Sequence, residues 1–217
     1  MTDTQLRSDV QDELRYDPRL DDDSIAVSAS DGVVTLRGTV GSFRDKREAT
    51  TATKRVYGTK RVENQLEVKL LTDDRRADAE LRGDVLQALM LDTLVPSTVD
   101  AKVDDGVVTL TGTAHLHFER DEAEYVAGNV KGVTDVSDDI ELIAPPPIAG
   151  DVKYSITKAM QRDAKLDSGG VHVDTADNGT VKLTGSVRSW AEHDAAVDAA
   201  WAAPGVLEVD DDLKVAY

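Results

Sequence analysis

The sequence predicts an α+β protein built from three tandem α-β-β-α-β modules, and two observations lead to this fold class. The stretch DGVVTLRGTVGS, residues 31–42, returns as DGVVTLTGTAHL from residue 105 and, in looser form, as DNGTVKLTGSVRS from residue 177. Three glycine columns keep internal spacings of 6 and 20 residues in every copy. We expect these glycines to lie at structural turns: Gly32, Gly38, Gly58, Gly106, Gly112, Gly132, Gly179, Gly185 and Gly205. A repeat at fixed period means that each copy is one structural unit.

The segments between the copies set the expected domain boundaries. LTDDRRA (71–77) and the proline-rich APPPIAG (144–150) are typical of linkers. We therefore expect module 1 at 1–71, a linker at 72–76, module 2 at 77–143, a second linker at 144–149 and module 3 at 150–217.

Each copy opens with an amphipathic helix, because apolar residues recur at intervals of four and so share one helix face. These residues are Leu6, Val10, Leu14; Leu81, Val85, Leu89; and Val152, Ile156, Met160. Two strands rich in β-branched residues follow, joined at Asp31-Gly32, Asp105-Gly106 and Asn178-Gly179. Such pairs favour the positive φ angles of a tight hairpin turn.

A second helix and a last strand complete the unit. Small residues at i, i+3, i+4 and i+7 predict a buried helix stripe: Ala49, Ala52, Thr53, Val56; Ala123, Val126, Ala127, Val130; Ala196, Ala199, Ala200, Ala203. Ser42 with Asp45, and Ser189 with Glu192, are typical of helix N-caps. Alternating apolar residues then predict a strand: Val62, Leu66, Val68; Val136, Ile140, Leu142; Val209, Leu213, Val215.

This order of elements, with DGVVTLRGTV and the closing VYGTKRVENQLEVKL, resembles the BON family, the domain of osmotically inducible and nodulation-related bacterial proteins. The resemblance covers nearly the whole chain. It implies a three-stranded mixed sheet covered on one face by two helices, and a bacterial source. It also implies a role in binding phospholipid or potassium, or in pores and secretins, with no catalytic residues to carry over.

Charge and composition narrow the function classes. The net charge of −17 opposes binding to nucleic acid, because each neutralised phosphate needs a nearby Lys or Arg. Module 1 is nearly balanced, whereas residues 72–147 hold 6 basic and 17 acidic residues. The N-terminus lacks a signal-peptide pattern and no long apolar run occurs, so we expect a soluble, cytoplasmic chain, peripheral to a membrane at most. The absence of cysteine excludes disulfides and thiolate chemistry.

No nucleotide-binding, nucleophile-elbow or triad motif occurs, so we expect no enzyme activity and no cofactor. The acidic runs at 21–23 and 210–212 are typical of a solvated surface, with a weak cation site as the alternative. His115 and His117 are spaced to share a metal with Glu119 or Asp121. The other two copies lack ligands at these positions, which excludes a repeated metal function and favours histidines at solvent.

The second helix of module 1 places several basic residues opposite its buried stripe. Residues 37–61 carry eight basic and two acidic residues, a local charge of +6. The candidate contact residues are Arg44, Arg47, Lys54, Arg55, Lys60 and Arg61. One interpretation is a docking face for an anionic surface. The other is an exposed helix whose charges meet the acidic module 2.

Trp190 and Trp201 are the candidate contact residues of module 3. They lie eleven residues apart, within about 20° of one another on a helix, and both miss the buried stripe. Their rings can serve a lipid or partner contact, or they can pack against the helix of their own or a neighbouring module.

We therefore expect a non-enzymatic binding or scaffold protein of stress or envelope type, a monomer or weak homo-oligomer. Its expected partner is anionic phospholipid or an envelope protein, bound by multivalent contacts through repeated helix faces. A K⁺ or Ca²⁺ sensor and a self-associating structural protein are the two alternatives.

Overall fold

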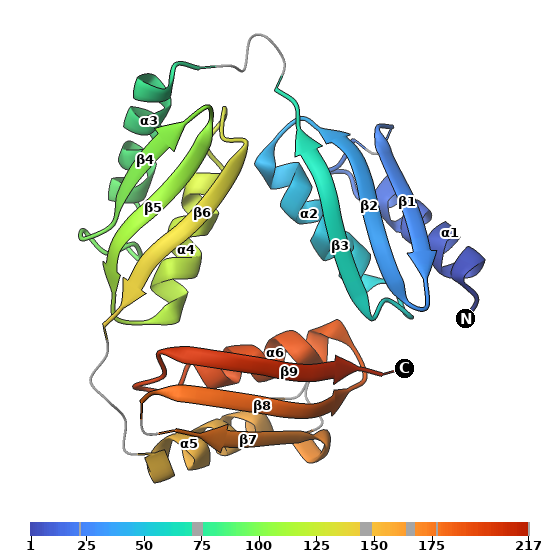
Figure 1. Ribbon diagram of the computed structural model, residues 1–217, viewed down its shortest axis with the longest axis vertical. Coiled ribbons are helices and arrows are strands. Elements are labelled where there is room, and N and C mark those ends of the chain that lie inside the picture. Colours follow the sequence, from blue (N-terminus) through green and yellow to red (C-terminus); the bar gives the residue numbers. More distant parts are fainter. Residues whose placement is uncertain (22, 71–75, 144–148, 164–167, 177, 217) are drawn as a thin grey trace. The chain divides into compact units, whose positions relative to one another are not determined.

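A computed structural model describes residues 1–21, 23–70, 76–143, 149–163, 168–176 and 178–216. The strands form three separate sheets, and Figure 1 shows that the helices of each module lie on one face of its sheet. The elements of module 1 are α1 (Asp3–Tyr16), β1 (Ile25–Ser30), β2 (Val33–Val40), α2 (Phe43–Arg55) and β3 (Arg61–Val68). Those of module 2 are α3 (Asp78–Leu91), β4 (Asp100–Asp104), β5 (Val107–Ala114), α4 (His117–Gly128) and β6 (Asp135–Leu142). Those of module 3 are α5 (Ala149–Arg162), the 3₁₀ turn η2 (Ser168–Gly170), β7 (Val171–Thr175), β8 (Thr180–Val187), α6 (Trp190–Trp201) and β9 (Glu208–Val215). The predicted fold class is confirmed.

Each sheet has the second strand of its module in the centre, in the orders β1-β2-β3, β4-β5-β6 and β7-β8-β9. The first strand pairs antiparallel with the central one, as in Ile25↔Gly38 and Val171↔Gly185. The third strand runs parallel to the central one in modules 1 and 3, as in Val34↔Val62. A parallel neighbour needs a crossover connection, and the second helix of each module supplies it.

The core of each module lies between its helices and its sheet. In module 1 the predicted helix residues Leu6, Val10 and Leu14 are buried against Val34 and Leu36 of β2, and Ala49 and Ala52 of α2 close the same cluster. The equivalent residues of the first helices in modules 2 and 3 are also buried. Among the described residues, no helix is long and apolar enough to cross a bilayer.

The glycine columns have two different structural roles, one in turns and one inside strands. Gly32 and Gly106 follow Asp31 and Asp105, and all four residues have positive φ, which confirms these two tight turns. The Gly58, Gly132 and Gly205 column also has positive φ, in the turn after the second helix.

The second column was expected at turns, and this prediction was wrong: Gly38, Gly112 and Gly185 lie inside the central strands β2, β5 and β8. Their φ angles are 122° to 124°, and a Cβ on Gly38 would lie 1.9 Å from the carbonyl oxygen of Ser24. Glycine is therefore needed here because the backbone just before the first strand of each module approaches closely.

The third hairpin also differs from the prediction. β7 ends at Thr175 and β8 begins at Thr180, so the loop is longer than in the other modules. Ala176 donates its N–H to the Thr180 carbonyl at 2.9 Å, and Gly179 has a φ of 86°.

Candidate binding surfaces

The basic residues of module 1 depend on how α2 is placed. The Ser42 side chain accepts a hydrogen bond from the Asp45 N–H, as predicted for its N-cap, and Ala49, Ala52 and Thr53 are buried. The opposite side of α2 therefore carries its charged residues away from the core.

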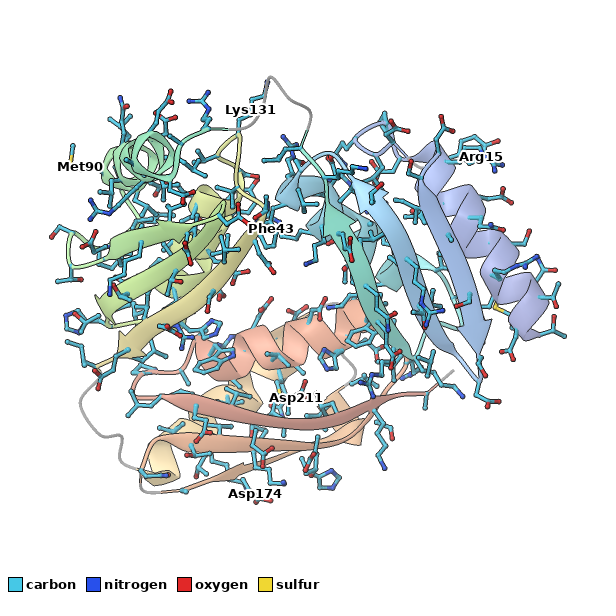
Figure 2. All side chains as sticks on the ribbon, turned by 45° about the horizontal axis from the view of Figure 1, so that its top comes forward. Arg15, Phe43, Met90, Lys131, Asp174 and Asp211 are labelled. Atoms are coloured by element: carbon cyan, nitrogen blue, oxygen red, sulfur yellow. The ribbon has the colours of Figure 1, made fainter. Side chains whose placement is uncertain are left out.

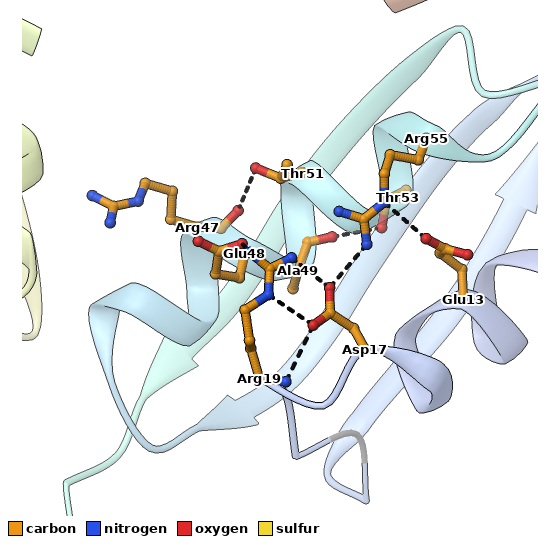
Figure 3. Close-up of polar contacts among 9 residues, drawn as sticks. All are labelled: Glu13, Asp17, Arg19, Arg47, Glu48, Ala49, Thr51, Thr53 and Arg55. Carbon is orange, nitrogen blue, oxygen red and sulfur yellow. Dashed lines mark hydrogen bonds and ion pairs between the residues drawn. The ribbon is translucent and has the colours of Figure 1, made fainter.

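Arg55 does not simply face solvent, although it belongs to this outer side. Its Nε donates to Glu13 Oε1 at 2.8 Å and its Nη2 donates to Asp17 Oδ2 at 2.8 Å (Figure 3). Asp17 also accepts from Arg19 Nε at 2.9 Å and Arg19 Nη2 at 2.7 Å. Arg19 forms a further ion pair of 2.8 Å with Glu48 of α2.

This network, which we call the Asp17 cluster (Glu13, Asp17, Arg19, Glu48 and Arg55), ties the loop after α1 to α2. The Asp17 side chain is only 3% exposed. The hydrogen bonds from Arg19 and then Arg55 hold the pKa of Asp17 far below its usual value, and the bond to Asp17 raises the pKa of Arg55. Asp17 and Arg55 therefore stay ionised at any physiological pH, and the cluster has a structural role in module 1.

The other basic candidates divide by their contacts. Arg44 and Lys60 are exposed, and within the described part of the chain the side chains of these two residues form no hydrogen bond or ion pair. The stem of Lys60 lies over Gly32. Arg61 is exposed and lies 3.7 Å from Glu63, a weak pair. Arg44 and Lys60 are therefore the cations most accessible to a ligand.

Arg47 and Lys54 are half-buried side chains of α2. The Arg47 carbonyl accepts a bond from the Thr51 hydroxyl at 3.3 Å, within the helix (Figure 3). Lys54 has an interaction partner and is not a free cation.

Trp190 and Trp201 lie at the two ends of α6. Both are partly buried and both pack against the core cluster of module 3. The Trp190 ring also lies 4.7 Å from the His193 ring, centroid to centroid. These contacts favour the interpretation in which the rings support their own module.

The acidic run at 210–212 is contacted by nitrogen-bearing side chains of module 3. Lys182 of β8 lies 2.8 Å from Asp210 and 2.5 Å from Asp212. Hydrogen bonds to these carboxylates raise the pKa of Lys182 well above its usual value, and the bond from Lys182 lowers the pKa of Asp212. Asp211 of β9, labelled in Figure 2, lies 2.8 Å from His193 Nε2 of α6. An ammonium group thus lies between the carboxylates where a free cation would bind.

The histidines of module 2 have structural partners as well. His115 Nδ1 lies 2.9 Å from the Ile143 carbonyl oxygen. Glu119 accepts the N–H groups of His115 and Leu116 at 2.8 and 3.1 Å, as a helix cap does. Across the described ranges, no group of three or more His, Asp or Glu side chains is arranged to hold a metal ion.

The chain was compared with known protein families, proteins and solved structures. The sequence model of the BON domain matches residues 2–69, 77–144 and 150–217. The chain is 35% identical over 145 residues to the Osmotically-inducible protein Y of Escherichia coli (strain K12), covering 63% of this chain and 72% of that protein. Among solved structures, CdsD, a structural protein of the type III secretion system of Chlamydia trachomatis, matches at 14% identity with a TM-score of 0.26, covering 96% of this chain and 91% of that one. The C-terminal domain of CdsD matches at 13% identity with a TM-score of 0.28, covering 100% of both chains.

Proposed function

Because the chain belongs to the BON domain family, we propose that it is a non-enzymatic binding protein of osmotic or envelope stress, which attaches to anionic phospholipid through the basic residues of module 1. The similarity to an osmotically inducible protein supports the stress-related part of this proposal. The described residues offer no motif or cluster that supports a catalytic role instead.

The observation that carries the binding proposal is the exposure of Arg44 and Lys60 without an internal partner. Arg61 adds a third exposed cation that is only weakly paired. Module 1 is also the only module whose acidic and basic residues nearly balance, with 12 basic and 13 acidic residues in 1–71. A lipid headgroup therefore meets less repulsion here than at residues 72–147.

The expected affinity of one chain is low. A basic residue near an anionic bilayer contributes about 1 kcal/mol of binding free energy. Three such residues therefore contribute less than a millimolar Kd requires, which is about 4 kcal/mol. Stable attachment then requires several contacts made at once, either by one chain or by chains held together.

Vesicle sedimentation tests the proposal. We expect the protein to sediment with phosphatidylglycerol-containing vesicles but not with phosphatidylcholine vesicles, and to be released when KCl rises from about 0.1 M to about 1 M, because the screening length falls from about 10 to 3 Å. The double variant Arg44→Glu and Lys60→Glu should lose this binding. The control variant Lys102→Glu and Lys158→Glu makes the same change in net charge on modules 2 and 3 and should keep it.

Three results would count against the proposal: equal binding to both kinds of vesicle, absence of binding to either, or equal loss of binding in the two double variants. Absence of binding to either vesicle would refute attachment to lipid and favour a protein partner for the exposed cations.

A further inference from the structure

One backbone edge of module 1 is open. β1 is the outer strand of its sheet, and Thr39 N–H donates to the Ser24 carbonyl at 3.3 Å. Because antiparallel hydrogen-bonded pairs alternate along a strand, Ile25, Val27 and Ala29 direct their N–H and C=O groups away from β2. Within the described part of the chain, no group hydrogen-bonds to this side of the three residues.

On the opposite edge of each sheet, a side-chain oxygen accepts one of the outward backbone N–H groups, in the same way in all three modules. In β3 the Asn64 side-chain oxygen accepts the outward N–H of Leu66 at 3.0 Å. Asp138 does the same for Ile140 at 2.9 Å, and Asp211 for Leu213 at 3.0 Å. A side chain thus occupies a backbone donor that another strand would need.

The first strands of the other two modules are also protected. In β4 the Arg82 guanidinium of α3 donates to the outward carbonyl of Ala101 at 2.6 Å. The same strand carries Asp100, Lys102 and Asp104. β7 carries Asp174, which pairs with Lys153 of α5 at 3.1 Å. Charged residues on an edge strand oppose pairing with another chain.

β1 has none of these features. Its sequence, IAVSAS, contains no charged residue in a protein that is 31% charged. Ile25, Val27 and Ala29 are half-buried on the helix side, whereas Ala26, Ser28 and Ser30 are exposed on the open face of the sheet. β1 is therefore an uncharged strand with a free row of donors and acceptors.

We propose that β1 is a self-association site, at which β1 of a second copy of this chain adds antiparallel about a two-fold axis through Val27. In this register Ile25 faces Ala29 of the other copy and Val27 faces itself. Every outward N–H and C=O of the three residues then has a partner, because those residues form the hydrogen-bonded pairs. The half-buried side chains meet on the helix side, and Ala26 meets Ser28 on the open face, so the pattern of the two strands agrees.

The charges around β1 determine how this association responds to salt. The same register places Asp23 opposite Asp31 of the other copy at both ends of the pair, and each chain carries −17. Salt screens both repulsions, so the dimer should strengthen as ionic strength rises. A contact between the basic residues of module 1 and acidic module 2 would instead weaken with salt.

Sedimentation equilibrium of the full chain over a range of concentrations tests the proposal. We expect a monomer–dimer equilibrium whose dimer fraction increases from about 0.1 M to about 1 M KCl. Ala29→Pro removes an outward N–H that β2 does not use, which an edge strand tolerates, and should raise the dimer Kd about tenfold or more. The matched control is Val103→Pro at the equivalent position of β4, which should leave the Kd unchanged.

A spin label checks the register. The chain has no cysteine, so Ser28→Cys provides a single labelling site on the open face. The two labelled residues lie diagonally across the new pair, with Cα atoms about 7–8 Å apart, and should show spin–spin broadening that disappears on dilution.

Three results would overturn the proposal: a monomer at all concentrations and salt levels, a dimer that salt dissociates, or a Val103→Pro variant that dissociates as far as Ala29→Pro. If hydrogen exchange shows that Ala29→Pro unfolds module 1, Ser28→Lys replaces it. This variant changes only an exposed side chain, and it places the lysines of the two copies diagonally across the pair, where their like charges repel. If the Ser28→Lys protein still forms the dimer, the proposed site is refuted.

Discussion

Substitution of Asp17 by Asn tests whether the Asp17 cluster stabilises module 1. The change keeps the size of the side chain but removes its charge, and it turns one of two accepting oxygens into a donor that faces a guanidinium. Hydrogen bonds to a charged group contribute about 1.5–3 kcal/mol. Arg19 and Arg55 are 43% and 42% exposed, so water solvates them again once the carboxylate is gone. We therefore expect a loss of about 2 kcal/mol in the free energy of unfolding of module 1.

The assay must report on module 1 alone. Both tryptophans of the chain lie in module 3, so tryptophan fluorescence does not follow module 1. Hydrogen exchange of a peptide covering β2, where Val34 and Leu36 are fully buried, does so. A loss of about 2 kcal/mol makes exchange through unfolding about 30-fold faster, whereas a peptide covering β8 should be unchanged and serves as the internal control.

The pH dependence gives a second check on the same cluster. The pKa of Asp17 is lowered in the folded state, so the unfolded chain takes up a proton near its ordinary pKa of about 3.9 while the folded chain does not. The stabilisation is therefore complete above that pH and decreases as the pH falls toward the folded pKa. The difference between wild type and Asp17→Asn should be constant near neutrality and shrink below about pH 4. A difference that persists unchanged in acid, or equal exchange rates at neutral pH, would refute the assigned role.

Three further predictions concern modules 2 and 3. Gly112→Ala should destabilise module 2 strongly, because the new Cβ would lie 2.2 Å from the Thr98 carbonyl oxygen. The control Gly83→Ala meets nothing within 4 Å and should stabilise α3 by about 0.5–1 kcal/mol. Hydrogen exchange of a peptide covering β5 measures both effects. Lys182→Gln frees two carboxylates, so added Ca²⁺ should raise the Tm of the variant more than that of wild type in fluorescence melts. Addition of anionic vesicles should leave the emission maximum unchanged, because Trp201 packs on its own core; a blue shift would contradict this interpretation.

Local patterns in the sequence were sufficient to predict the scaffold. The spacing of Leu6, Val10 and Leu14 predicts a buried helix face, and Asp31-Gly32 predicts a tight turn, because both depend on neighbours within a few residues. Gly38 shows where such reasoning fails. Its spacing marks it as a special position, but only the strand pairing shows that the Ser24 carbonyl leaves no room for a side chain.

The candidate binding residues were harder to predict than the scaffold. Helical periodicity correctly places Arg55 on the outer side of α2, yet its partner Asp17 lies 38 residues earlier in the chain. A helical wheel cannot distinguish a side that faces water from one that faces the polar side chains of another element. The same limit applies to the acidic run at 210–212, whose partner Lys182 becomes visible only from the register of β8 and β9.

The two proposed contacts of module 1 respond to salt in opposite directions, and the charge distribution explains why both belong to one chain. Binding to anionic lipid depends on attraction to a few cations such as Arg44 and Lys60, so screening weakens it. Pairing through β1 joins two acidic chains by uncharged backbone groups, so screening strengthens it. A dimer also doubles the number of exposed cations that one particle presents to a membrane, and so raises its avidity. At low salt the chain should therefore bind vesicles weakly as a monomer, and vesicle binding should pass through a maximum at intermediate salt; in the Ala29→Pro variant it should only decline.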